Sequence, residues 1–286
     1  MRLAGSRHAA LVSLRCRWVR SRFVWQHTRM DSLTRIATAT LAVLFATTTT
    51  PPGATAAESR PVSGAAPAEI QIGLCAPAEE IVRALDLRPR AAAIEVWQFD
   101  DETLTLYRRG LRLRLRVTPD GRSVLTLKVA DRDCAQLDPK RVPRGEGKCE
   151  YDVYGTTIVG AVSLNVTLDE DKTNELIAGR ATPADVLSAA QTRYLREVVG
   201  MWPLPPEIRK LGPMSVQTYR TRGSRYDIDV SELSGGERFA EISRKAPLDD
   251  ASRTMAAMKT ELSRAGIAMC ADQSSQAANK LRALLK

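Results

Sequence analysis

Residues 111–117 read LRLRLRV, a strict alternation of apolar and basic residues. Side chains of a β-strand point alternately to opposite faces, so this period of two predicts a strand with leucines on one face and arginines on the other. The segment Thr118-Pro119-Asp120-Gly121 that follows is typical of a tight turn, and residues 123–129 show a second strand pattern. We therefore expect a hairpin that carries a row of arginines.

Strand patterns recur on both sides of this hairpin. They mark the further segments 68–74, 92–99, 148–154, 214–221, 225–232 and 237–245. Helical spacing marks the segments 77–87, 169–180, 183–201, 248–265 and 274–285, with Thr182 expected as an N-cap and Pro183 in the first turn. We expect an α+β fold, because eight antiparallel strands can close into a barrel that holds side chains or one small ligand.

The net charge is concentrated at the amino-terminal end. The chain of 286 residues has a formal charge of +9, but residues 1–57 contain eight arginines and one acid, Asp31. The remainder holds 34 basic and 32 acidic residues and is nearly balanced. We therefore do not expect nucleic acid as a partner.

The first 57 residues resemble a leader. A charged segment at 30–35 precedes an apolar run at 36–46 and the small residues Ala54-Thr55-Ala56. This is the pattern of a signal peptide over 30–57, cut near Ala56–Ala57, and residues 1–29 are then an over-called start. A retained membrane anchor is the alternative, although the apolar run is shorter than the ~20 residues that span a bilayer. We expect a secreted or extracytoplasmic protein without a permanent anchor, with a flexible linker at 58–67 and one folded domain at 68–286.

Cysteine usage agrees with export. Cys16 lies in the leader, and four cysteines remain. An even number in an exported chain indicates two disulfides, for which three pairings are open. Cys134 and Cys149 flank one loop and are expected to pair, which leaves Cys75 with Cys270. Free buried thiols are the alternative, and no Cys-x-x-Cys pair indicates a zinc site.

The domain lacks histidine. His8 and His27 both lie in the leader. Ser-His-Asp, Cys-His and histidine–metal chemistry are therefore excluded from residues 58–286. Catalysis there would depend on carboxylates, lysine, arginine, tyrosine or metal ions.

Charged side chains share single faces on several predicted strands besides 111–117. These are Lys128 on one strand, Lys148, Glu150 and Asp152 on another, and Glu241, Ser243 and Lys245 on the last. Each row alone is explained by a solvated face of a half-buried sheet. A closed ring of strands would instead direct the rows into one tunnel. Arginine and lysine in such a tunnel favour a polyanion, because the guanidinium group fits phosphate oxygens.

Several segments together resemble a known family. Residues 97–104 read WQFDDETL, residues 109–116 read RGLRLRLR, and residues 125–128 read LTLK. With Asp229, the FAEI segment at 239–242 and Lys280 in the last helix, they resemble the CYTH-like, or triphosphate tunnel, superfamily in order and spacing. The resemblance covers most of residues 68–285 and is weakest over a predicted helical insert at about 155–212.

The resemblance implies an eight-stranded antiparallel β-barrel, or tunnel, with flanking helices. It also implies cleavage of triphosphates with a divalent metal, Mg²⁺ or Mn²⁺, and some members are adenylate cyclases. The phosphate-binding candidates that it implies are Arg112, Arg114, Arg116, Lys128, Arg220, Arg222 and Lys245. The metal-binding candidates are Glu69, Gln71, Glu150, Asp229 and Glu241.

The sequence departs from the family pattern on the acidic side. The opening Glu-x-Glu-x-Lys reads Glu69-x-Gln71-x-Gly73, and the late Glu-x-Glu reads Glu241-x-Ser243. Two carboxylates and one lysine are thus replaced, and Mg²⁺ and Mn²⁺ require charged oxygen ligands. The metal site is therefore expected to be degenerate.

Three functions follow from these observations. The first is an exported protein that binds a phosphate-rich anion, such as triphosphate, polyphosphate or another phosphorylated small molecule, with catalysis weakened or lost. The second is a metal-dependent triphosphatase or polyphosphatase. The third is a structural or interaction module whose tunnel is filled by its own salt bridges.

Overall fold

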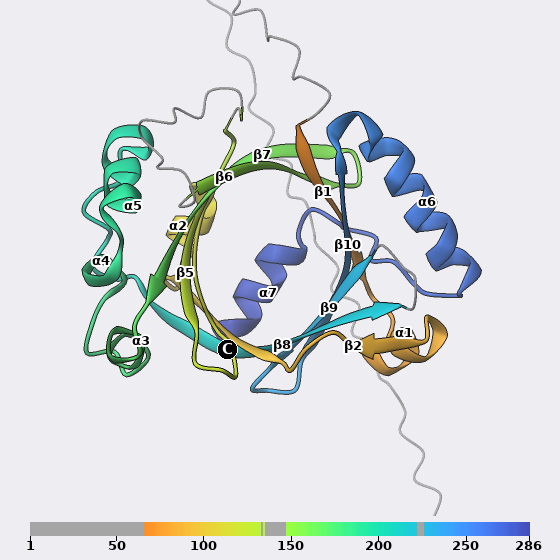
Figure 1. Ribbon diagram of the computed structural model, residues 1–286, viewed down its shortest axis with the longest axis horizontal. Coiled ribbons are helices and arrows are strands. Elements are labelled where there is room, and N and C mark those ends of the chain that lie inside the picture. Colours follow the sequence, from red (N-terminus) through yellow and green to blue (C-terminus); the bar gives the residue numbers. More distant parts are fainter. Residues whose placement is uncertain (1–65, 133, 135–146, 222–225) are drawn as a thin grey trace, which may run out of the picture. The chain divides into compact units, whose positions relative to one another are not determined.

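The computed structural model describes residues 66–132, 134, 147–221 and 226–286. They all belong to one compact unit, Ser59–Lys286. Nine strands of this unit form a closed ring in the order β8-β3-β4-β5-β7-β6-β1-β10-β9, and pairing of β9 with β8 closes it (Figure 1). Their bounds are β1 Pro67–Leu74, β3 Ile94–Asp100, β4 Leu111–Val117, β5 Ser123–Ala130, β6 Gly147–Tyr154, β7 Thr157–Leu168, β8 Arg209–Thr221, β9 Asp227–Leu233 and β10 Arg238–Pro247.

The barrel confirms the expected α+β architecture but differs in detail from eight antiparallel strands. The ring has nine strands, and β1 pairs in parallel with β6. A short additional strand, β2 (Leu87–Pro89), pairs with β8. The extra strand of the ring is β7, which occupies the first part of the section predicted as a helical insert at 155–212. Its sequence is rich in β-branched residues and follows Gly155, which has a φ of 60°, so strand propensity and turn chemistry could have identified it.

Helices lie around the barrel wall, and the last of them, α7, packs against its inner side (Figure 1). They are α1 Ala78–Ala84, α2 Thr105–Arg108, α3 Glu170–Ile177, α4 Pro183–Val186, α5 Ala189–Tyr194, the π-helix Leu195–Val199, the 3₁₀-helix Leu248–Asp250, α6 Ala251–Arg264 and α7 Gln276–Leu284. The predicted helix at 183–201 is thus three shorter elements. Thr182 and Asp185 form a capping box at the start of α4, as expected at this N-cap. Ser188 and Gln191 form a second box that starts α5.

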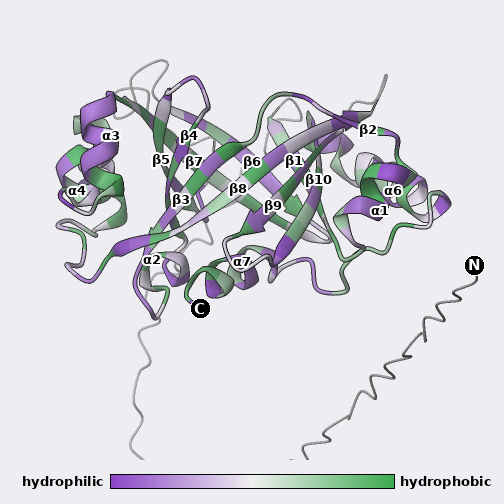
Figure 2. Cartoon of the chain, turned by 90° about the horizontal axis from the view of Figure 1, so that it is seen from below, coloured by the Kyte–Doolittle hydropathy of each residue, from purple (hydrophilic) through white to green (hydrophobic). Residues whose placement is uncertain are grey.

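The two larger apolar cores lie outside the barrel wall. Leu113 and Leu115 of β4 are buried in a core that includes Leu176 of α3 and Leu195 of the π-helix. A second core joins the outward faces of β1, β9 and β10 to α1 and α6 (Figure 1). The strands consequently alternate between hydrophobic and hydrophilic residues (Figure 2). Because the leucines face outward, the arginines of β4 face the barrel interior, as the alternation predicted.

The Asp100-Asp101 pair has a structural role. Asp100 is buried and accepts hydrogen bonds from the backbone N–H groups of Leu106 and Tyr107, at 2.9 Å each. Asp101 accepts backbone bonds from Thr103 and Thr105. Partial desolvation raises the pKa of Asp101, but hydrogen bonds from Thr105 and Thr103 outweigh it and lower the pKa to about 2. The pair therefore holds the turn and α2 at the end of β3.

Both predicted disulfides are present. Cys75 bonds to Cys270, and Cys134 bonds to Cys149. The first joins the end of β1 to the segment before α7, and the second joins β6 to the loop after β5. Across the described ranges, no helix is long and apolar enough to cross a membrane.

Candidate functional site: a polar chamber inside the barrel

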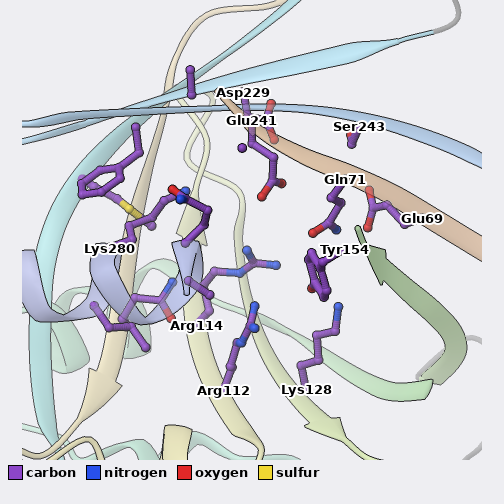
Figure 3. Close-up of a pocket in the computed structure, with 18 of the residues that line it drawn as sticks. Glu69, Gln71, Arg112, Arg114, Lys128, Tyr154, Asp229, Glu241, Ser243 and Lys280 are labelled. Atoms are coloured by element: carbon purple, nitrogen blue, oxygen red, sulfur yellow. The ribbon is translucent and has the colours of Figure 1, made fainter. Parts of the chain in front are cut away.

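A cavity of about 220 Å³ lies inside the barrel. Strand side chains form most of its wall, and α7 contributes the rest (Figure 3). We call this cavity the chamber. Its charged lining residues are Glu69, Arg112, Arg114, Arg116, Lys128, Asp229, Glu241 and Lys280. The structure thus gathers side chains that are far apart in the sequence at one enclosed polar site.

The basic wall of the chamber is strand β4. Arg112, Arg114 and Arg116 all line the cavity, and Figure 3 shows the first two pointing into it. Within the described residues, none of the three has a carboxylate within 4.0 Å. Burial lowers the pKa of Arg116, and the charges of Asp229 and Glu69 oppose this shift. Three cationic groups therefore face the chamber without a close counter-ion from these residues.

Lys128 differs from the arginines because it already has a partner. Its Nζ lies 2.5 Å from Oδ2 of Asp152, and the Asp152 side chain is almost fully buried. The other carboxylate oxygen of Asp152 has no hydrogen-bond partner among the described residues. Burial, followed by the charge of Asp152, raises the pKa of the neighbouring Tyr154. Lys128 therefore lines the chamber but adds little free positive charge.

The acidic wall is formed by β1, β9 and β10. Glu69, Asp229 and Glu241 line the chamber from these strands, and Asp229 and Glu241 are direct register partners. Oδ1 of Asp229 accepts a hydrogen bond from Oγ1 of Thr218 at 2.6 Å. Burial raises the pKa of Glu241. Lys280 opposes this shift, and Asp229 and Glu69 reinforce it.

The acidic wall does not fit a preformed divalent-metal site. Gln71 and Ser243 both line the chamber, and they lie directly opposite each other in the β1–β10 register. They present neutral oxygens at the two positions where the family pattern has carboxylates. In the part of the chain that the structure describes, no group of three acidic, cysteine or histidine residues could hold a metal ion.

Some predicted site residues lie elsewhere. Glu150 and Lys245 are not among the residues that line the chamber, and they bond to each other at 3.0 Å. Glu150 also pairs with Lys148, at 2.5 Å. Arg220 is exposed and pairs with Asp227 at 2.7 Å. Arg222 lies outside the described residues.

Residues of the α7 region complete the site. Gln273, Gln276 and Lys280 are among those that line the chamber, and none of them is a site residue predicted from the sequence. Nζ of Lys280 lies 3.1 Å from Oγ of Ser231 and 6.0 Å from the ring centroid of Phe239. The family resemblance noted Lys280, whereas no local signal pointed to the two glutamines.

Comparisons with known proteins bear on the fold. No protein-family model matches the chain, and no curated protein sequence matches it. Among solved structures, HpAC1 from Hippeastrum, a proposed adenylyl cyclase with a dominant triphosphatase activity, matches with a TM-score of 0.51 and 17% identity, over 73% of this chain and 92% of that chain. A proposed adenylate cyclase from Bacillus halodurans matches with a TM-score of 0.48 and 14% identity, over 73% and 96%. The protein PH1819 from Pyrococcus horikoshii gives 0.41 and 14%, over 74% and 98%.

At this level of identity, the likeness to HpAC1 shows a shared fold.

Proposed function

We proceed from the CYTH-like tunnel fold of this chain and propose that the protein binds a phosphate-rich anion of the triphosphate or polyphosphate type in the chamber, with catalysis weakened or lost. The observation that carries the proposal is the row of arginines on β4. Arg112, Arg114 and Arg116 line one enclosed cavity and have no ion pair within the described residues.

An anion should bind here because an enclosed charge without a counter-ion has a high free energy. Removing an ion from water is expensive unless a counter-ion and hydrogen bonds replace the lost solvation. Phosphate oxygens provide both to a guanidinium group, often through two parallel N–H···O bonds. A ligand with several phosphates would therefore satisfy neighbouring arginines together.

The charge balance in the chamber favours an anion in the absence of metal. Lys128 is neutralised by Asp152. Four other cationic side chains, Arg112, Arg114, Arg116 and Lys280, line the chamber, against the carboxylates of Glu69, Asp229 and Glu241. Burial raises the pKa of Glu241 and so disfavours its charged form. Replacement of two family carboxylates by Gln71 and Ser243 thus supports direct anion binding.

The alternative function is a metal-dependent triphosphatase or polyphosphatase. The triphosphatase activity of HpAC1, which shares the fold, favours it. The carboxylates of Glu69, Asp229 and Glu241, which line the chamber together with the arginines, also favour it. When bound, Mg²⁺ or Mn²⁺ would neutralise phosphate oxygens and activate water. These three residues would have to converge to hold such an ion.

One experiment separates the functions. The full chain is titrated with tripolyphosphate in EDTA by calorimetry, and phosphate release is measured in parallel with Mg²⁺ or Mn²⁺. We expect binding in EDTA and no release above the protein-free blank. Metal-dependent release would establish the triphosphatase instead. Absence of both binding and release would favour a structural or interaction module.

We also propose that the protein acts outside the cytoplasm after cleavage near Ala56–Ala57. The leader pattern of residues 30–57 and the two disulfides support this location, because disulfides persist in oxidising compartments. Fractionation of cells that express the full chain, with the mass of the exported product, tests it. An intact chain retained in the cytoplasm would contradict it.

A further inference from the structure

Helix α7 packs against the inner side of the barrel. Ala283 and Leu284 of α7 pack against a small apolar cluster formed by Val96, Met214 and Leu233 of three strands. Lys280 lies one turn earlier on the same face and lines the chamber (Figure 3). One face of the helix therefore docks at its carboxyl end and lines the site one turn before.

The segment before α7 is fastened to the end of β1. The Cys75–Cys270 disulfide joins the two, and Cys270 N donates to Gly73 O at 3.0 Å. Gln273 adds two contacts to the same glycine, because its Oε1 accepts from Gly73 N at 2.6 Å and its Nε2 donates to Gly73 O at 3.1 Å. Six positions separate Cys270 from Gln276, the first residue of α7.

Gly73 and α7 fit each other closely. A Cβ atom at position 73 would lie 2.7 Å from Cγ of Gln276, so a side chain here would push against the helix. The family resemblance places a lysine at this position, where the chain has glycine. Lys280 follows Gln276 by four residues, on the same face of the helix. This chain thus has no side chain at position 73 of β1, and α7 occupies the space beside it. The cation comes from the helix instead, as Lys280.

Among the described residues, Lys280 is held by a hydrogen bond and a ring contact. Its Nζ donates to the buried Ser231, and no carboxylate of the described residues lies within 4.0 Å. The helix has nine residues, and isolated helices of this length are marginal in water. The position of Lys280 therefore depends on the docking of α7 and on its fastening to β1.

We infer that Lys280 is an anion-binding residue of the chamber and that Gln273 and the Cys75–Cys270 disulfide are positioning residues for it, so that breaking this disulfide weakens anion binding. The inference rests on the proposed function. Because linkage is reciprocal, bound anion should also protect this disulfide from reduction. The second disulfide lies away from α7 and should show neither effect.

The test uses tripolyphosphate as the probe and calorimetry of the full chain. The Cys75→Ser/Cys270→Ser variant should lose affinity by about tenfold or more, the scale expected when one charged hydrogen-bond donor is lost. The matched control, Cys134→Ser/Cys149→Ser, should stay within about twofold of the parent chain. Equal losses in both disulfide variants would overturn the inference.

A double-variant cycle separates positioning from general loss of stability. Lys280→Ala should weaken binding about tenfold in the parent chain and add little once Cys75 and Cys270 are serine, because Lys280 is then already displaced. Lys280→Arg should retain most of the affinity. Full additivity of the lysine and cysteine changes would contradict the inference.

Hydrogen exchange tests the positioning without any ligand. Loss of protection in α7, with the barrel strands still protected, is expected in the Cys75→Ser/Cys270→Ser variant. Unchanged protection of α7 would contradict the positioning role of the disulfide, even if tripolyphosphate does not bind and the proposed function fails. If the double cysteine variant loses protection throughout the chain, hydrogen exchange of the Gln273→Ala variant is the test. This variant keeps both disulfides and should still expose α7.

Discussion

The basic and acidic walls of the chamber have the same construction and different chemistry. On β4 each inward position between Leu111 and Val117 is arginine, whereas the inward positions of β1 and β10 include both carboxylate and neutral residues. The outward faces of both walls contribute buried apolar residues, as Leu113 and Ile72 illustrate. Because the two larger cores lie outside the barrel, the charged residues of the inner faces can change without loss of the fold. The difference between the walls therefore reports on function.

The largest expected effect comes from breaking the basic wall. Replacing Arg112 and Arg114 by alanine together should weaken binding of tripolyphosphate roughly a hundredfold, because each removes a hydrogen-bonded charge worth about 1.5–3 kcal/mol. Calorimetry in EDTA measures the change. The melting temperature should stay the same or rise, because both arginines lack an ion pair within the described residues.

Arg220→Ala is the matched control for this double variant. Arg220 pairs with Asp227 on the exposed end of β8, away from the chamber, so its removal should change affinity by about twofold at most. A larger loss for Arg220→Ala than for the double variant would place the anion site elsewhere on the barrel.

The sequence predicted which face of each strand is polar but not where each side chain lies along the barrel. The alternation in 111–117 correctly placed leucines and arginines on opposite faces, and the tunnel hypothesis is what directed the arginines to the interior. The same argument placed Lys245 with the phosphate ligands, yet it bonds to Glu150 instead of lining the chamber. A period of two fixes the face of a residue, whereas its depth depends on strand tilt and on register with distant strands.

Contacts between distant strands could not be predicted from the sequence either. Asp152 neutralises Lys128, and neither local pattern predicts this ion pair. The disulfides were predictable because four cysteines allow few pairings and one pair flanks a loop. The strand β7 was missed because the helical patterns at 169–180 and 183–201 extended the predicted insert back to residue 155, over a stretch with strand propensity.

A second prediction restores charge to the acidic wall. Gln71→Glu with Ser243→Glu places two carboxylates opposite each other near Glu69 and Glu241. A unit charge added roughly 8 Å from a phosphate costs about 2 kcal/mol at an effective dielectric constant of about 20, and solvent in the chamber reduces this. We expect metal-free affinity for tripolyphosphate to fall about tenfold, and Mg²⁺ or Mn²⁺ affinity to rise.

The variant Ser243→Gln, with Gln71 retained, has the same shape as the carboxylate pair and controls for changes of shape in this experiment. It adds no charge and should leave metal affinity unchanged. Equal metal affinity in the carboxylate variant and this control would show that positions 71 and 243 do not map to the family's metal ligands.

The smallest expected effect concerns the charge that remains on the acidic wall. Burial raises the pKa of Glu241 above its ordinary value of 4.5. Between 4.5 and the raised value the folded state binds more protons than the unfolded state, so this group makes the fold less stable as pH rises through that window. Glu241→Gln removes the titration. The free energy of unfolding should therefore match that of the parent chain at the low end of the window and exceed it at higher pH.

The affinity for the anion should depend on the protonation of Glu241 as well. At low pH Glu241 is neutral in the parent chain, so parent and Glu241→Gln chains should bind tripolyphosphate equally well. At high pH the carboxylate repels the ligand, and the variant should bind a few-fold more tightly. Comparing the two chains at each pH cancels the protonation of the ligand itself. Equal affinities of the two chains at every pH, including above the titration of Glu241, would mean that the anion does not sense this carboxylate, and hence that it does not occupy the chamber between the two walls.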